Sequence, residues 1–127
     1  MQIKADHFAF AVSDVDRSIA FFQEVLELPL MFVEEDPEHG EKFAFLALDG
    51  GNLEVLSSLE GNQPPAVSSF LNCPHLAIGV SDMSEFVARL DQLGVNYEGP
   101  NIIPDKVTWL YFRDPDGNVI EACQWLS

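Results

Sequence analysis

The sequence predicts an α+β fold built from two tandem βαβββ modules. The first observation behind this prediction is a repeat, because residues 7–14 (HFAFAVSD) return as residues 75–82 (HLAIGVSD). The second is the pattern after each copy, where an apolar stripe with helical spacing gives way to short runs with strand character. A segment that recurs with the same surroundings indicates a duplicated structural unit.

In the first copy we expect a strand over residues 4–12 and a helix capped by Ser13 or Asp14. Pro29 ends this helix, because proline cannot continue it. Three more strands follow, and residues 49–52 (DGGN) form a tight hairpin turn. The helical stripe consists of Val15, Ile19, Phe22 and Leu26, and the three strands span residues 30–35, 43–48 and 53–58.

The second copy has the same layout. Asp82 is expected to cap a helix with apolar positions that include Phe86 and Leu90, and Gly94 ends this helix. Residues 99–105 are expected to form a loop, and residues 114–117 (DPDG) a turn. The expected strands span residues 75–80, 95–98, 107–113 and 118–125.

At 127 residues the chain fits a single domain with a substantial core. We expect module 1 over about residues 1–58, a linker over residues 59–72, and module 2 over about residues 73–127. The linker is assigned from Gly61, two consecutive prolines and several serines, which interrupt every pattern.

Charge and hydropathy restrict the partners. The chain has 21 acidic and 6 basic residues, for a formal charge of −15, and its few lysines and arginines are scattered. Nucleic acid and anionic membranes are therefore not expected partners, since both need clustered cations. No apolar run approaches the roughly 20 residues of a membrane span, and the N-terminus lacks a signal-peptide layout. We expect a cytoplasmic protein, with Cys73 and Cys123 as reduced thiols rather than a disulfide framework.

Four polar residues occupy equivalent places in the two copies. His7 and His75 open the first strands 68 positions apart, and Glu54 and Glu121 lie in the last strands 67 positions apart. A single strand histidine or glutamate is usually solvated or paired with a neighbour, and we assign His39 in its polar turn that way. Recurrence in register instead suggests one shared partner, and imidazole and carboxylate groups suit a divalent metal such as nickel, zinc, iron, cobalt or manganese.

These features resemble a known family. The two histidine strands ending in Val-Ser-Asp, the segment RSIAFF at residues 17–22, and DPDGNVIE at residues 114–121 are similar to the vicinal oxygen chelate superfamily. This superfamily comprises glyoxalases, bleomycin-resistance proteins and extradiol dioxygenases. The resemblance covers essentially the whole chain. It implies paired βαβββ modules that form a cupped, barrel-like cleft with the metal inside, and it implies a homodimer.

Within this family, the order His7, Glu54, His75, Glu121 is similar to the metal set of bacterial glyoxalase I. That similarity implies a lactoylglutathione lyase-like metalloenzyme with nickel or zinc first in order of expectation, followed by cobalt, manganese or iron. The reaction it implies is an isomerase- or lyase-type proton transfer on a small substrate that chelates the metal through vicinal oxygens. Glu121 or Glu54 would then carry the proton. The chain has Glu27 where the family commonly has glycine after the first helix.

Two other functions stay open. A small-molecule binding or resistance protein would use the same cleft without a metal. An iron-dependent extradiol dioxygenase would retain His7, His75 and Glu121 as ligands. Strand parity also places Cys73 on the face of His75 and Cys123 on the face of Glu121, where each would either border the site or fill the core. Trp109 and Tyr111 share a strand face, and they would either stack on a flat ligand or belong to the core. Glutathione itself finds little support, since its carboxylates call for cations that the chain largely lacks.

Overall fold

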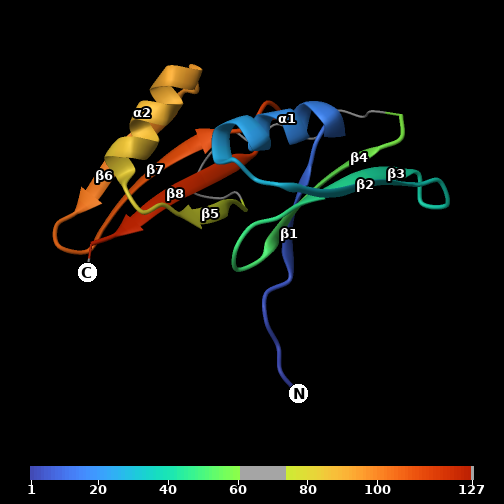
Figure 1. The fold of residues 1–127 in the computed structure, drawn as a ribbon, viewed down its shortest axis with the longest axis horizontal. Helices are drawn as coiled ribbons and strands as arrows, with labels where there is room; N and C mark the ends of the chain where they lie inside the picture. The colour runs from blue at the N-terminus through green and yellow to red at the C-terminus, as the bar shows by residue number, and fades with distance from the viewer. Residues whose placement is uncertain (61–73, 127) are drawn as a thin grey trace. The chain divides into compact units, whose positions relative to one another are not determined.

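The computed structural model describes residues 1–60 and 74–126. The chain divides into two compact units, Met1–Pro65 and Ala66–Ser127. Each unit contains one helix and one four-stranded sheet, and neither sheet closes on itself (Figure 1). The prediction of an α+β fold with two βαβββ modules is confirmed. Most of the expected linker lies outside the described residues.

Unit 1 has the strand order β1-β4-β3-β2. The first strand pairs in parallel with the last, and the other neighbours are antiparallel. A helix connects the first strand to the second. The elements are β1 (His7–Ala11), α1 (Val15–Leu26), β2 (Leu30–Asp36), β3 (Glu41–Leu46) and β4 (Asn52–Ser58).

Unit 2 repeats this topology with the order β5-β8-β7-β6. Its first and last strands are again parallel, and the remaining pairs are antiparallel. The elements are β5 (Leu76–Gly79), α2 (Met83–Leu93), β6 (Tyr97–Ile103), β7 (Val107–Arg113) and β8 (Val119–Trp125).

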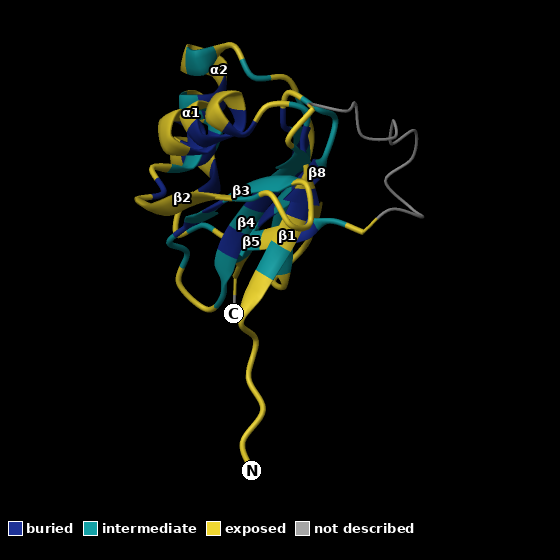
Figure 2. Cartoon of the chain, turned by 90° about the vertical axis from the view of Figure 1, so that its right-hand side faces the viewer, coloured by how far each residue is buried: buried dark blue, intermediate teal, exposed yellow. Residues whose placement is uncertain are grey.

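One face of each sheet packs against its helix and forms the core. In unit 1 the rings of Phe10 on β1 and Phe22 on α1 stack with centroids 6.2 Å apart. In unit 2 the rings of Phe86 on α2 and Phe112 on β7 lie 5.8 Å apart. Apolar residues of the helices and of the sheets are buried, and the segments that they occupy are dark blue in Figure 2. The buried strand residues include Phe10, Ala44, Leu46, Leu53 and Val55 in unit 1, and Leu110, Ile120 and Ala122 in unit 2.

Both helices begin and end through local chemistry. The Asp14 and Asp82 carboxylates accept hydrogen bonds from the backbone N–H groups of Arg17 and Glu85, so both predicted caps are confirmed. Gly94 ends α2 in the left-handed conformation with φ 71°, as predicted. In unit 1 Glu27 takes the same role with φ 57°, so α1 ends before Pro29.

Two expectations were wrong in detail. Residues 99–105 do not form a loop throughout, because β6 continues to Ile103 past an irregularity between Glu98 and Asn101. This strand is at the edge of its sheet, and its outer side has no neighbouring strand. The missing N–H of Pro100 therefore removes no hydrogen bond between strands on that side. On α1, Val25 is buried where Leu26 was expected. In the described part of the chain, neither helix has the length and apolar character needed to cross a membrane.

Candidate metal and substrate site

The candidate site lies on the sheet faces turned away from the helices. In unit 1, strand register pairs Ala9 with Glu54 and Phe45 with Glu54. Register partners share a face, and alternation along the strands separates them from buried Phe10 and Val55. Glu54 therefore lies on the face opposite α1.

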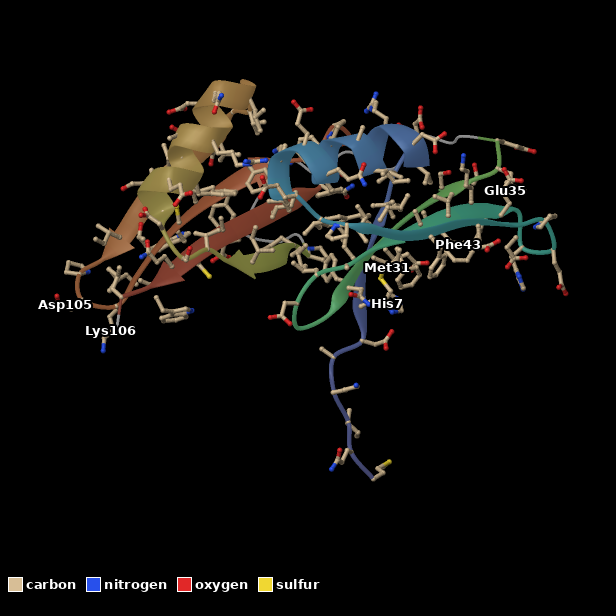
Figure 3. The ribbon with its side chains drawn as sticks, viewed as in Figure 1. His7, Met31, Glu35, Phe43, Asp105 and Lys106 are labelled. Atoms are coloured by element: carbon tan, nitrogen blue, oxygen red, sulfur yellow. The ribbon has the colours of Figure 1, made fainter. Side chains whose placement is uncertain are left out.

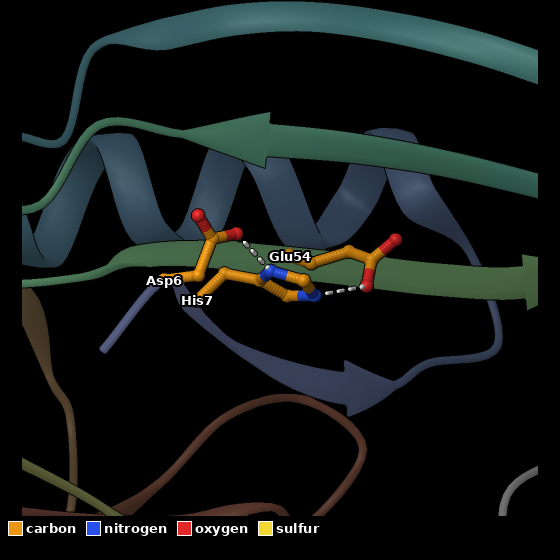
Figure 4. Close-up of polar contacts among 3 residues, drawn as sticks. All are labelled: Asp6, His7 and Glu54. Atoms are coloured by element: carbon orange, nitrogen blue, oxygen red, sulfur yellow. Dashed lines mark hydrogen bonds and ion pairs between the residues drawn. The ribbon is translucent and has the colours of Figure 1, made fainter. Parts of the chain in front are cut away.

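His7 and Glu54 come together on this face, as the sequence predicts. The His7 Nε2 atom lies 3.4 Å from Glu54 Oε1 (Figure 4). Their side chains are 37% and 17% exposed, so the pair is accessible without being fully solvated. Strand β1 presents the imidazole, and the parallel neighbour β4 presents the carboxylate.

Asp6 fixes the orientation of the His7 ring. Its Oδ2 lies 2.7 Å from His7 Nδ1. An ionised carboxylate only accepts hydrogen bonds, so Nδ1 carries the proton and donates. The Nε2 atom then faces the Glu54 carboxylate without a proton of its own. Both groups are hydrogen-bond acceptors, so a shared proton or a bound cation must offset the repulsion between them. The Asp6 hydrogen bond, aided by the Glu54 charge, raises the pKa of His7 above its usual 6.5.

Unit 2 contains the equivalent pair. His75 Nε2 lies 3.0 Å from Glu121 Oε1, and the side chains are 27% and 22% exposed. Glu121 is the register partner of Ala77, as Glu54 is of Ala9. The position before His75 is Pro74, which has no carboxylate to offer. The two pairs match in topology, but the residue before the histidine differs, since it is Asp6 in unit 1 and Pro74 in unit 2.

Small residues keep these faces open. Ala9 and Ala11 beside His7, and Ala77 and Gly79 beside His75, are all exposed. A Cβ atom added at Gly79 would meet nothing within 4 Å. Space is therefore present beside the histidine on both faces.

An aromatic ring packs against each histidine. Phe45 meets His7 edge to face with centroids 5.0 Å apart, and Tyr111 meets His75 in the same manner at 5.7 Å. Each ring belongs to the residue opposite the glutamate in the sheet register. Tyr111 was predicted to be a candidate for ligand stacking, but Phe45 was not, although the two residues lie 66 positions apart, close to the offset of the repeat.

The cysteine and histidine expectations have separate outcomes. Cys123 is half-buried and pairs in register with Trp109, and burial followed by the Glu121 charge raises the pKa of its thiol. Cys73 lies outside the described residues. The ring of exposed His39 bonds to Asp36 at 2.7 Å within the polar turn, as the solvated assignment implies.

The donor set fits a divalent metal. Two imidazole nitrogens, which are borderline ligands, and two carboxylate oxygens, which are hard ligands, together suit nickel, zinc, cobalt, manganese or iron. Within residues 1–60 and 74–126, no three His, Cys, Asp or Glu side chains gather into a group that would hold a metal. Each unit by itself brings together one His–Glu pair.

Comparison with known proteins agrees with the fold. Residues 4–122 match the model of the Glyoxalase/Bleomycin resistance protein/Dioxygenase superfamily. The chain is 31% identical to a lactoylglutathione lyase of Haemophilus influenzae, with 91% of this chain and 87% of that protein aligned. It is 27% identical to the metallothiol transferase FosB of Shouchella clausii, with 92% and 77% aligned. A glyoxalase family protein of Enterococcus faecalis superposes with a TM-score of 0.77 at 27% identity, with 96% of each chain covered.

Proposed function

The chain belongs to the Glyoxalase/Bleomycin resistance protein/Dioxygenase superfamily, and from this membership we propose that it is a divalent-metal-dependent enzyme of the glyoxalase type. The proposed reaction is an isomerase- or lyase-type proton transfer next to a carbonyl, on a small substrate with oxygens on neighbouring carbons. This is the reaction type of the lactoylglutathione lyases to which the chain is similar. A proton transfer of this kind needs a positioned base and a group that stabilises negative charge on oxygen.

One observation carries the proposal. In both units a histidine Nε2 faces a glutamate oxygen, at 3.4 Å in unit 1 and 3.0 Å in unit 2, on a face cleared by small residues. A half-buried carboxylate in an apolar strand is costly unless a partner compensates it. The recurrence of this histidine–glutamate pair at equivalent positions supports a shared metal bound by His7, Glu54, His75 and Glu121.

The residues then have distinct roles. His7 and His75 hold the metal through Nε2, and Asp6 keeps the His7 ring in the orientation that this requires. When bound, the metal supplies a Lewis acid for the negative charge that develops on the substrate oxygens. Glu121 or Glu54 accepts the proton from the carbon next to the carbonyl and returns it to the neighbouring carbon, so the substrate is isomerised without loss of atoms.

Metal analysis tests the proposal directly. The purified protein is loaded with nickel, zinc, cobalt or manganese and dialysed, and the bound metal is measured by mass spectrometry. We expect about one ion per chain, as for a single four-ligand site, and loss of that ion in His7→Ala and in His75→Ala. His39→Ala is the matched control and should retain the metal. A protein that binds none of the four metals contradicts the proposal.

Activity is tested by deuterium exchange. The metal-loaded protein is placed in D2O with 2-hydroxyacetophenone, which has a carbonyl and a hydroxyl on adjacent carbons, and exchange at the CH2 group is followed by NMR. The hemithioacetal of methylglyoxal and glutathione is assayed in parallel. Oxygen consumption with catechol by the iron-loaded protein would indicate the dioxygenase instead, and ligand binding without metal would indicate a sequestering protein.

We propose a cytoplasmic homodimer as the working form. Exposed apolar residues on the edge strand β6, Ile102 at 63% and Ile103 at 50%, support a contact between copies. Light scattering is expected to give twice the 14.1 kDa chain mass. A monomer at micromolar concentration would contradict this part of the proposal.

A further inference from the structure

We propose that the substrate is an uncharged molecule with an aromatic or similarly flat apolar group beside its vicinal oxygens. This inference rests on the proposed function and names the substrate class of the same site. The feature that recognises the apolar group is a cluster of three phenylalanines, Phe32, Phe43 and Phe45, called here the aromatic wall. All three residues belong to unit 1.

The three rings of the aromatic wall contact one another. Phe32 stacks on Phe45 with centroids 5.2 Å apart, and Phe43 meets both rings edge to face at 6.2 Å. They come from adjacent strands, with Phe32 on β2 directly opposite Phe45 on β3. Phe32 is 41% exposed, and Phe43 and Phe45 are half-buried, so part of each ring remains available to a ligand.

The aromatic wall is continuous with the metal-binding pair. Phe45 is the register partner of Glu54 and packs edge to face on the His7 ring. Figure 3 shows Phe43 and His7 on the same side of the unit 1 strands, opposite α1. A substrate whose oxygens reach the His7–Glu54 pair therefore places its next atoms against these rings, where flat apolar groups bind well.

The charges on this face exclude an anionic substrate. Glu34 is the register partner of Phe43, and Asp36 is the register partner of Glu41. Glu41, Phe43 and Phe45 alternate along β3, and Phe45 is the partner of Glu54. The carboxylates of Glu34, Asp36 and Glu41 therefore share the face of Glu54. Lys42 lies on the opposite face, where its Nζ contacts Asp16 of α1 at 3.3 Å. A ligand carboxylate would meet negative charge here without a compensating cation.

The other cations of the chain are located elsewhere. Lys4 precedes β1, Arg17 is on α1, and Arg89 is on α2. Lys106 is in the turn between β6 and β7, and Arg113 donates a hydrogen bond to the Gly117 carbonyl in the turn after β7. These five and Lys42 are all the lysines and arginines in the sequence. None of the first five lies on the strands that form the wall and the His7–Glu54 pair, and Lys42, which lies on β3, is on the opposite face, where it contacts Asp16.

A matched pair of probes tests the inference. One is 2-hydroxyacetophenone, which is uncharged, and the other is 4-(2-hydroxyacetyl)benzoate, which adds only a carboxylate on the ring. Their binding to the zinc-loaded protein is measured by calorimetry. We expect the dissociation constant of the neutral probe to be lower by about tenfold or more, which corresponds to about 1.4 kcal/mol.

Two variants separate recognition from folding. Phe32→Lys adds a cation at the most exposed ring, and we expect it to weaken the neutral probe and to tighten the carboxylate probe. A misfolded protein would lose both. Phe21→Ala removes a half-buried phenyl group from α1 on the other side of the sheet, and it should leave the preference unchanged.

The outcomes distinguish this inference from the proposed function. Equal or tighter binding of the carboxylate probe, or binding of neither probe, overturns the inference. If Phe32→Lys changes only the oligomeric state, the wall is a contact between copies and the inference also fails. Metal binding with turnover of the glutathione adduct would leave the proposed function standing and the substrate class wrong. Absence of metal binding would contradict the proposed function itself.

Discussion

His7 and Asp6 form a short hydrogen bond, with Nδ1 and Oδ2 2.7 Å apart, that determines which ring nitrogen faces Glu54. Replacing Asp6 by Asn removes the charge and the stronger acceptor, so the raised pKa of His7 should fall toward 6.5. An NMR titration of the His7 ring protons in protein without added metal measures this change. An unchanged His7 pKa would mean that Asp6 does not hold the ring in solution.

The same bond affects stability and metal binding. A histidine with a raised folded-state pKa stabilises the fold fully below the unfolded pKa of 6.5, and the effect is lost as the pH rises through the folded pKa. Asp6→Asn should therefore destabilise the metal-free protein more at about pH 5.5 than at about pH 8.5. Metal affinity should fall by about 10- to 100-fold, as for other carboxylates behind metal-binding histidines. Asp36→Asn removes an equivalent 2.7 Å contact to His39, away from the proposed ligands, and should leave metal affinity unchanged.

The repeat explains why so much of the fold was predictable. The two histidine strands aligned the two modules with each other. The caps Asp14 and Asp82 were predictable because their side chains bond locally to the first turn of the helix. The pairing of His7 with Glu54, and of His75 with Glu121, was predictable because parallel neighbours in equivalent modules bring equivalent residues together.

Residues that depend on cross-strand register were harder to predict. Phe45 contacts His7 because β3 lies beside β4 with Phe45 opposite Glu54, and no local pattern in β3 encodes that alignment. Asp6 lies within the strand expected over residues 4–12 and is distinguished only by its contact with His7. The continuation of β6 past Pro100 was missed because proline usually ends a strand, and only an edge position tolerates it.

The end of α1 offers a stabilising substitution. Glu27 has φ 57°, a left-handed conformation that is unfavourable for a residue with a Cβ atom. Glu27→Gly should raise the free energy of unfolding by about 0.5–1 kcal/mol, the usual advantage of glycine at this position after its greater freedom in the unfolded chain is included. Urea denaturation measures it. Gly94→Ala, at the equivalent end of α2 with φ 71°, should lower the free energy of unfolding instead.

Asp114 is expected to be important for folding rather than for chemistry. It is 5% exposed, and its carboxylate accepts bonds of 2.8–2.9 Å from the backbone N–H groups of Asp116 and Asn118 and from the Asn118 side chain. Asp114→Ala leaves these donors unsatisfied and should cost about 2–3 kcal/mol in urea denaturation. Exposed Asp49, in the corresponding turn of unit 1, is the control, and its replacement by Ala should change stability by less than about 0.5 kcal/mol. Equal effects of the two substitutions would contradict this role.

Replacing each glutamate of the site by glutamine identifies which of the two proposed metal-binding glutamates also acts as the base. Glutamine keeps the size and one carbonyl oxygen but cannot accept a proton at neutral pH. The variant that removes the base should retain metal and lose about 10²- to 10⁴-fold in kcat, measured by deuterium exchange. The variant that removes a ligand should lose metal affinity first, and activity should recover at high metal concentration.

Glu54 and Glu121 contact their histidines at 3.4 and 3.0 Å, so the more loosely held Glu54 is expected to be the base. Glu34→Gln changes an exposed carboxylate on the same face as Glu54 and should preserve both metal binding and kcat. If Glu54→Gln and Glu121→Gln both retain metal and full activity, neither glutamate moves the proton.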